Sequence, residues 1–296
     1  MSASNLVTIS SGDLTARIDP FGAELVSLTD SLGREYMTDA DPAFWTGHAP
    51  LLFPIVGGVN GNRLRIDGAE YELPRHGFAR RSAFEIVEVG ESRAQFRLRD
   101  SEETRAVYPF AFMLDMIFTL EGMTLRMTAS VTNPGDTVLP FSFGYHPAFA
   151  WPLPGGADKA DHVIAFDQAE EQGIRRLDPA SGLLLPDVLP SAVEGHHLAL
   201  DAALFDDDAM IWTNLSSRSL TYGAPGAAQL AITFPDMAML GLWQKPGAAF
   251  LCIEPWQGHA DPVDFAGDFG DKPGIVKLPA GESRAFRMDV SVLSAD

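Results

Sequence analysis

The sequence has 296 residues, 46% of them hydrophobic, and a formal net charge of −19 from 40 acidic and 21 basic residues. This charge excludes nucleic acids and anionic membrane surfaces as favoured partners, because both would repel the protein. The one cysteine, Cys252, excludes an internal disulfide. No apolar run approaches the ~18 residues of a membrane-spanning helix, and MSASNLVTIS at the start lacks the features of a signal peptide, so we expect a cytoplasmic protein.

Alternation of apolar and polar residues predicts β-strands along most of the chain. The first examples are DLTARID (13–19), FEIVEVG (84–90) and AQFRLRD (94–100). Apolar residues then occupy every second position from Phe112 to Leu120 and from Met123 to Val131, with Glu121-Gly122 between them as a predicted hairpin turn. The same period returns from Phe286 to Val292, so we expect strands that bury one face and expose the other.

Helical patterns are weak, since only 41–47 and 200–210 could each form a turn or two. With 27 Gly and 21 Pro between short strands, the sequence predicts an all-β protein, a large antiparallel β-sandwich. Residues 152–200 are rich in helix and strand breakers and predict the longest excursion from the sheets. The strand patterns on both sides of that segment resemble each other, so we expect a single domain over residues 1–296. No pattern indicates an oligomeric state.

Four stretches place polar side chains where strands run into Gly- or Pro-containing turns. They are FPIVGGVNGNRLRIDG with Arg63, ELPRHGFARRSAF with His76, LPFSFGYHPAFAWPL with His146 and LCIEPWQGHAD with Glu254. A sheet aims such side chains and a loop exposes them, which favours function. Each also has a structural interpretation, because the histidines can be satisfied core residues and Arg63 can pair with a surface acid. A buried Glu254 can belong to a structural salt bridge.

The sequence predicts neither a metal nor a cofactor. His196-His197 and the His259-Ala-Asp261 segment have no recognised ligand spacing, and a single cysteine removes a thiolate site. The acidic run 206–208 lacks the glycine and distal glutamate of an EF-hand loop. No P-loop, GxGxxG or GxSxG motif is present.

Taken together, four segments in order along residues 10–290 resemble the signature segments of aldose 1-epimerases, the galactose mutarotase-like family. They are LLFPIVGGVNGNRL, LPRHGFAR, FGYHPAF and CIEPWQGHAD, and the likeness is to the bacterial branch with HGFAR, HPAF and CIEPW motifs. The resemblance implies a β-sandwich that binds a sugar across one concave sheet without a cofactor. It implies that Glu254 is the general base and His146 the general acid, and that the sugar is bound by His76, Arg63 and Asp208.

Three positions leave alternatives within this resemblance. Asp206 and Asp207 stand beside Asp208, and any of the three matches the substrate-binding aspartate of the family. Gly58 stands where relatives often have arginine, and Tyr145 stands where many have glycine. We expect both departures to alter which sugar fits.

The chemistry of anomer exchange fits the residues. Opening an aldose ring requires a base to take the O1 proton and an acid to protonate the ring oxygen O5, on either side of C1. Burial should raise the pKa of Glu254, and a histidine such as His146 titrates near neutrality. Trp256, Trp243 and Phe149 are candidates to face the apolar side of the sugar.

Three alternative functions remain on the basis of the sequence. A glycoside hydrolase would need two carboxylates flanking the bond, whereas the sequence offers one carboxylate with two histidines. A non-catalytic carbohydrate-binding protein would have no need of an acid and base. An epimerase for hexose 6-phosphates would place several arginines around the phosphate, and Arg75, Arg80 and Arg81 surround His76 in the sequence.

Overall fold

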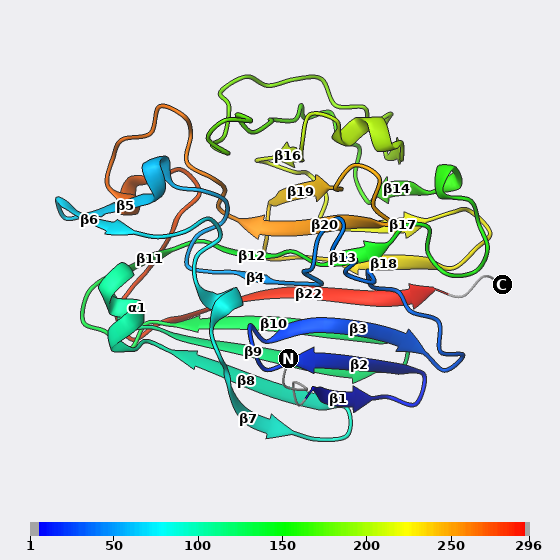
Figure 1. The fold of residues 1–296 in the computed structure, drawn as a ribbon, viewed down its shortest axis with the longest axis horizontal. Coiled ribbons are helices and arrows are strands. Elements are labelled where there is room, and N and C mark those ends of the chain that lie inside the picture. Colours follow the sequence, from blue (N-terminus) through cyan, green and yellow to red (C-terminus); the bar gives the residue numbers. More distant parts are fainter. Residues whose placement is uncertain (1–5, 294–296) are drawn as a thin grey trace.

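The computed structural model describes residues 6–293, and within this range the chain forms two large and three small antiparallel sheets (Figure 1). The largest is a nine-stranded sheet with the order β15 (His197–Ala199), β14 (Val163–Phe166), β17 (Ser219–Gly223), β18 (Gln229–Thr233), β22 (Ser283–Leu293), β10 (Thr124–Thr132), β9 (Met113–Glu121), β8 (Arg93–Arg99) and β7 (Glu85–Val89). The second is a six-stranded sheet of β16 (Met210–Trp212), β19 (Met239–Trp243), β20 (Phe250–Gln257), β12 (Phe143–Tyr145) and β4 (Leu51–Leu52), with β13 (Ala148–Ala150) also paired to β20.

The small sheets and helices complete the fold. The three-stranded sheet has β1 (Val7–Ser10), β2 (Leu14–Asp19) and β3 (Glu24–Asp30), and the two hairpin-like pairs are β5 (Arg63–Ile66) with β6 (Ala69–Glu72) and β11 (Leu139–Phe141) with β21 (Val276–Leu278). The helical segments are short: α1 (Glu102–Val107) and the 3-10 turns η1 (Asn60–Asn62), η2 (Ala79–Arg81), η3 (Lys159–Asp161), η4 (Ala202–Phe205) and η5 (Phe269–Asp271). No helix within the described range is long and apolar enough to cross a membrane.

The predicted alternation is confirmed in β9, β10 and β22. Leu125 pairs with Leu120 on one side and Val290 on the other, and all three side chains are buried in the core. The polar positions between them face away from the core, as a half-buried strand requires. Register places Glu121 opposite Thr124, so the hairpin turn is Gly122-Met123, one residue later than predicted. Gly122 has a φ of 54°, which a glycine adopts without steric cost.

The sandwich forms because several sheets bury their apolar faces against one another. One core cluster joins inward-facing residues of the nine-stranded sheet, of the six-stranded sheet and of β1–β3. Figure 1 shows β1–β3 over the part of the nine-stranded sheet that holds β8–β10, and these strands are in contact. The all-β sandwich class is therefore confirmed. The outer face of the six-stranded sheet is not part of this core.

Tyr145 ties the two large sheets together. Its side chain runs from β12 into the core, where the hydroxyl accepts the N–H of Ala129 at 3.0 Å and donates to the carbonyl of Phe286 at 2.9 Å. Ala129 and Phe286 are paired partners in the opposite sheet, so the tyrosine inserts into that ladder. The expectation that Tyr145 alters the choice of sugar is corrected, because its hydroxyl points into the core between the sheets.

Two regions differ from the predicted elements. The excursion expected over 152–200 is narrower, because 163–166 and 197–199 form β14 and β15 at one edge of the nine-stranded sheet. Helix α1 was not predicted; it begins where Ser101 caps the N–H of Thr104 and Thr104 in turn accepts the N–H of Ser101. That reciprocal capping, followed by two glutamates in the first turn, is the signal that could have found it.

Candidate active site

Strand β20 carries a carboxylate because its two faces differ. Leu251 and Ile253 point into the core between the sheets, whereas Cys252, Glu254 and Trp256 point to the outer face. The sequence predicted that Glu254 stands where a strand runs into a turn, but pairing with β19 continues through Trp256. Glu254 is therefore fixed within a hydrogen-bonded strand, opposite Gly241 of β19, instead of at a strand end.

The outer face of this sheet forms the floor of a cavity of about 240 Å³. This volume lies just below the ~300 Å³ at which small-molecule sites usually begin, so the cavity can hold one small molecule. Four residues predicted for the site line it together: Glu254, His146, His76 and Asp208. The other polar and aromatic lining residues are Trp45, Arg75, Arg80, Trp243 and Trp256.

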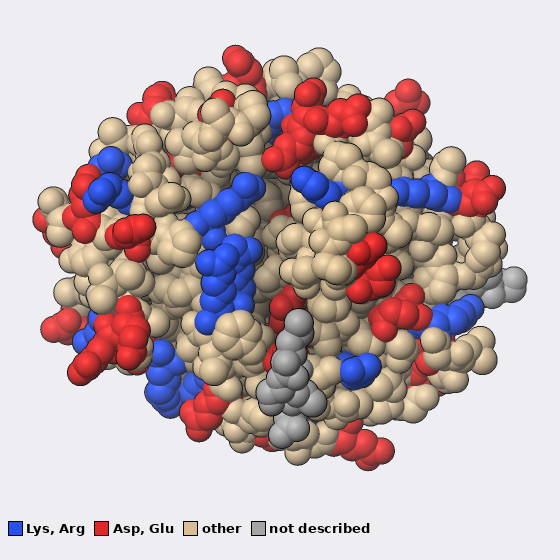
Figure 2. Space-filling model, in the orientation of Figure 1, with Lys and Arg blue, Asp and Glu red and all other residues tan. Residues whose placement is uncertain are grey.

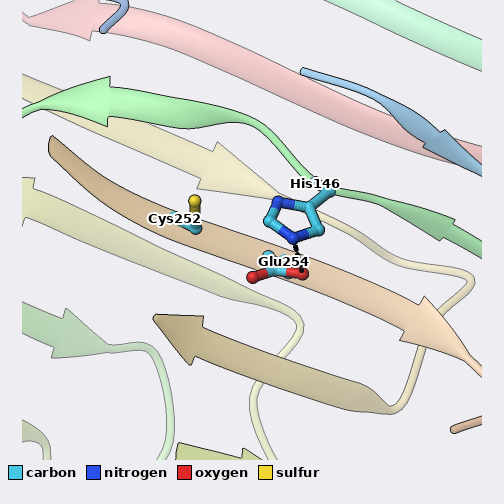
Figure 3. A group of neighbouring side chains, drawn as sticks. All are labelled: His146, Cys252 and Glu254. Atoms are coloured by element: carbon cyan, nitrogen blue, oxygen red, sulfur yellow. Dashed lines mark ion pairs between the residues drawn. The ribbon is translucent and has the colours of Figure 1, made fainter. Parts of the chain in front are cut away.

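Glu254 and His146 form a buried pair. Nε2 of His146 lies 3.2 Å from Oε2 of Glu254, and the two side chains are 10% and 3% exposed (Figure 3). Burial raises the pKa of Glu254 well above its ordinary value, although the charge of Arg75 opposes this. Burial, with Arg80 and Arg75 adding to it, lowers the pKa of His146 to about 3, which corrects the expectation of a near-neutral value. Both shifts favour the uncharged forms, so the pair holds one shared proton between the carboxyl group and the imidazole nitrogen that faces it.

His76 is held in one protonation state by the backbone. The N–H of Gly57 donates to Nδ1 of His76 at 3.1 Å, and the N–H of His76 donates to the carbonyl of Gly57 at 2.8 Å. An Nδ1 that accepts a hydrogen bond carries no proton, so the ring proton lies on Nε2. Burial, reinforced by His146, lowers the pKa of His76 well below its ordinary value, in agreement with a neutral ring. His76 is therefore a fixed hydrogen-bond donor beside the pair.

Comparison with known proteins identifies the group to which the chain belongs. The family model described as aldose 1-epimerase matches residues 5–269. The chain belongs to the aldose 1-epimerase family. The protein LacX of Lactococcus lactis subsp. lactis is 32% identical over 95% of this chain and 97% of its own length.

Solved structures agree with this membership. A galactose mutarotase related enzyme from Lactobacillus acidophilus has a TM-score of 0.90 at 30% identity, over 98% of each chain. A galactose mutarotase-like protein from Lactobacillus casei also has a TM-score of 0.90, at 27% identity, over 98% of this chain and 100% of the other. The sequence resemblance to the galactose mutarotase-like family is thereby confirmed.

In this aldose 1-epimerase family member, three tryptophans contribute to the apolar lining of the cavity. Trp256 lies flat over two glycines of the neighbouring strands, because a Cβ on Gly144 or Gly241 would come within 2.5 Å of its ring. Trp45 stacks on His146 with ring centroids 5.1 Å apart, and Trp243 meets His146 edge-on. The sequence did not predict Trp45 as a cavity residue. Of the three predicted aromatics, Trp243 and Trp256 face the cavity, whereas Phe149 is buried in the core.

Arg75 and Arg80 supply positive charge to the cavity. Within residues 6–293, no carboxylate lies within 4.0 Å of either guanidinium, and Nε of Arg80 is buried without a hydrogen-bond partner. Figure 2 shows basic side chains gathered beside a hollow near the centre of one face, although the protein as a whole is acidic. These arginines are therefore available to a ligand.

Among the three candidate aspartates, only Asp208 lines the cavity, whereas Asp206 and Asp207 are exposed. The N–H of Ala209 donates to Oδ1 of Asp208 at 2.7 Å, and Nη1 of Arg176 donates to its carbonyl oxygen at 2.5 Å. These contacts fix the turn that presents the carboxylate.

Arg63 lies outside the cavity, which does not fit its predicted role in sugar binding. It begins β5, its side chain is 58% exposed, and its guanidinium pairs with Glu70 across the β5–β6 hairpin. The structural interpretation, pairing with a surface acid, describes its position. Gly58 is also absent from the cavity lining, and it faces Gly182, which in turn approaches Arg75. Arginine therefore reaches the cavity from 75 and 80 instead of from 58 or 63.

A buried ion pair holds the cavity wall that carries Gly57. Nζ of Lys272 lies 3.0 Å from Oδ1 of Asp261, and the side chains are 0% and 4% exposed. Oδ2 of Asp261 accepts the N–H of Asn60 at 2.9 Å, and the main chain of Asp261 bonds to Gly58 and Leu184. Asp261 thus ties the 57–60 segment to two other loops, and this segment positions His76.

Proposed function

We propose that the protein is an aldose 1-epimerase, a mutarotase that interconverts the α and β anomers of a free aldose by opening and reclosing the ring. The Glu254–His146 pair on the floor of the cavity carries this proposal. A non-catalytic sugar-binding protein has no need to bury an acid and a base against each other. A hydrolase needs two carboxylates about 5–10 Å apart around the bond. Asp208 also lines the cavity, but the group in contact with Glu254 is the imidazole of His146.

The two groups lie side by side instead of on either side of C1, and this suits the substrate because O1 and O5 are bonded to the same carbon. In the proposed reaction the shared proton moves to Nε2 of His146 when the sugar enters, which leaves Glu254 as a carboxylate. Glu254 then takes the O1 proton while His146 protonates O5, and the C1–O5 bond breaks. After rotation about C1–C2 the same groups exchange roles and the ring recloses.

The surrounding residues have distinct proposed tasks. His76 donates from Nε2 to a sugar oxygen, because Gly57 occupies its other nitrogen. Asp208 accepts from a hydroxyl, and Trp243 or Trp256 faces the C–H side of the ring. Arg75 and Arg80, which line the cavity, take in this proposal the binding role that the resemblance implied for Arg63.

Only a sugar with a free anomeric hydroxyl should react. A methyl α-glycoside has no O1 proton for Glu254 to remove, so it should neither anomerise nor release methanol. The matching free sugar should reach its α/β equilibrium faster than in buffer, at the same final ratio, because a catalyst changes only the barrier. Proton NMR of the anomeric signals in both mixtures is the measurement. Methanol formation that scales with protein concentration would point to hydrolysis, and unchanged kinetics of the free sugar would point to mere binding.

Arg75 and Arg63 form a matched pair for testing the placement of the cavity. Arg75→Ala should raise KM by roughly one to two decades, since a hydrogen bond to a charged group contributes ~1.5–3 kcal/mol. Arg63→Ala should leave KM within twofold of the parent, because that guanidinium lies on the β5–β6 hairpin. Initial rates of anomer exchange over a range of sugar concentrations give both values. If Arg63→Ala raises KM and Arg75→Ala leaves it unchanged, the sugar is bound by Arg63 and not by Arg75.

A second candidate, an epimerase for hexose 6-phosphates, is favoured by the two cavity arginines, neither of which has a carboxylate within 4.0 Å among residues 6–293. The discriminating measurement is kcat/KM for a hexose and for its 6-phosphate under the same conditions. If phosphate is the natural substituent, the phosphorylated sugar should be preferred and Arg75→Ala should abolish that preference. If the free aldose is the substrate, Arg75→Ala should affect both sugars by a similar factor.

A further inference from the structure

Cys252 stands next to the catalytic pair without a task in the proposed reaction. It precedes Glu254 by two residues on β20, so its side chain lies on the same face of the sheet. The side chain is fully buried among Ala148, Phe250 and Trp243, and it does not line the cavity. It is the one cysteine of the chain, so any thiol chemistry can be assigned to it alone.

The thiol completes a set of three different ligand types. One ligand atom from each of His146, Cys252 and Glu254 lies within 4.8 Å of the others, and Figure 3 shows the three side chains projecting toward a common space. In addition, Nδ1 of His146 is buried and has no hydrogen-bond partner within the described residues. A buried polar nitrogen without a partner is unusual and indicates capacity for a further contact.

This donor set selects a particular class of ion. Zinc binds thiolate, imidazole and carboxylate at about 2.0–2.3 Å, usually with tetrahedral geometry, and three protein ligands leave its fourth position open. Magnesium and calcium prefer oxygen ligands and would gain nothing from the thiol. Ligand atoms around a tetrahedral ion of that size lie roughly 3–4 Å apart. Closing the cluster would therefore require shifts of about 1 Å or less per side chain, which rotation of the His146 ring and the thiol can supply.

We propose that His146, Cys252 and Glu254 form an inhibitory site for zinc and similar thiophilic divalent cations. Binding displaces the thiol proton and the proton shared by Glu254 and His146, and both are released to solvent. The ion then holds the carboxylate of Glu254 and the imidazole of His146, the two groups that the ring-opening reaction uses. A metal at this position prevents Glu254 and His146 from transferring protons, and removal of the metal restores the activity.

Metal binding can be tested without measuring activity. Co²⁺ added to the protein should produce the near-ultraviolet absorption of a thiolate-to-cobalt charge transfer, with one ion bound per chain. Cys252→Ser and Cys252→Ala should both lack this band, whereas His196→Asn/His197→Asn should keep it because that exposed pair lies elsewhere. Absence of the band in the parent, or its presence in Cys252→Ala, would overturn the proposed site.

Inhibition is the second readout, and it alone rests on the proposed function. Zn²⁺ should slow mutarotation by the parent, and a chelator should restore the rate. Cys252→Ala should match the parent rate in metal-free buffer and require at least tenfold more Zn²⁺ for half-inhibition. Equal inhibition of parent and Cys252→Ala would overturn the inhibitory role. A parent that binds Co²⁺ but shows no mutarotation in any buffer would instead contradict the proposed function and leave the metal site standing.

Discussion

Glu254→Gln is expected to lower kcat/KM for mutarotation by ~10²–10⁴-fold and, at the same time, to stabilise the protein at neutral pH. The loss of rate follows because an amide can neither take nor return the O1 proton. The gain in stability follows because a carboxylate buried to 2% exposure is costly when ionised, and the amide keeps the shape without the charge. Functional groups often impose such a cost on the fold.

The size of the stability effect depends on pH. In the unfolded chain Glu254 ionises near its ordinary pKa of 4.5, whereas burial raises the pKa in the folded state. Below 4.5 both states hold the proton, so the carboxyl group causes no pH-dependent loss. Above 4.5 ionisation favours the unfolded chain, and each unit of pKa displacement corresponds to about 1.4 kcal/mol. The stability advantage of Glu254→Gln should therefore grow as pH rises from 4.5 until the folded protein also ionises.

Glu170 provides a matched control with the opposite sign. It is also buried, but its two oxygens accept the N–H groups of Ser216 and Ser217 at 3.0 and 2.6 Å. An amide at position 170 would place an N–H₂ against one of these donors, so Glu170→Gln should destabilise the fold. Urea unfolding of the three proteins at several pH values provides the comparison. If Glu254→Gln keeps the parent rate, or is less stable than the parent at neutral pH, the view of Glu254 as a costly catalytic group is wrong.

Lys272→Met is expected to destabilise the protein by about 3–5 kcal/mol, because it leaves the charge of Asp261 buried without its partner. The expected damage extends to the site. Asp261 bonds to Asn60 and Gly58, and the same segment provides the Gly57 N–H that fixes His76. We therefore expect KM to rise in the folded fraction, while the Glu254–His146 pair keeps most of its kcat.

Lys277→Met is the control for this change. Lys277 pairs with Asp271 at 3.2 Å, but the two side chains are 56% and 75% exposed, so the loss should be at most ~1 kcal/mol. Adding Asp261→Asn to Lys272→Met removes the orphaned charge and should recover part of the stability. Thermal unfolding and initial rates together decide the matter. If the two lysine substitutions change the melting temperature and KM to the same extent, the buried pair does not help to position His76.

The periodic parts of the sequence predicted the fold, because alternation translates directly into the faces of strands. Leu125, Met127 and Val290 are buried at the positions that alternation indicates. The turn-rich motifs predicted that His76, His146 and Glu254 are important, and the structure brings all three to one cavity. Their proposed roles follow from the resemblance and await the measurements described above.

Features that depend on the path of a loop could not be predicted from the sequence. Arg63 and Arg75 both lie near strand ends, yet only Arg75 lines the cavity, and it adjoins His76, which has a φ of 69°. Tyr145 adjoins His146, but alternation within β12 sends its side chain to the other face of the sheet. The low pKa of His146 likewise follows from burial beside Glu254 and Trp45, and no local pattern encodes that burial.

The paired strands hold Glu254 and His146, whereas the connecting segments provide the other polar residues of the cavity. This arrangement determines which parts of the sequence can vary. Glu254 is held within a paired strand, and His146 sits between β12 and β13, which both pair with that strand. Arg75, Arg80 and Asp208 come from connecting segments around the rim. Segments 73–81 and 206–209 can therefore diverge, or be exchanged with those of a relative, while the Glu254–His146 pair keeps its geometry. Under the proposed function, such exchanges offer a direct route to altered sugar preference in laboratory evolution, with the sheet unchanged.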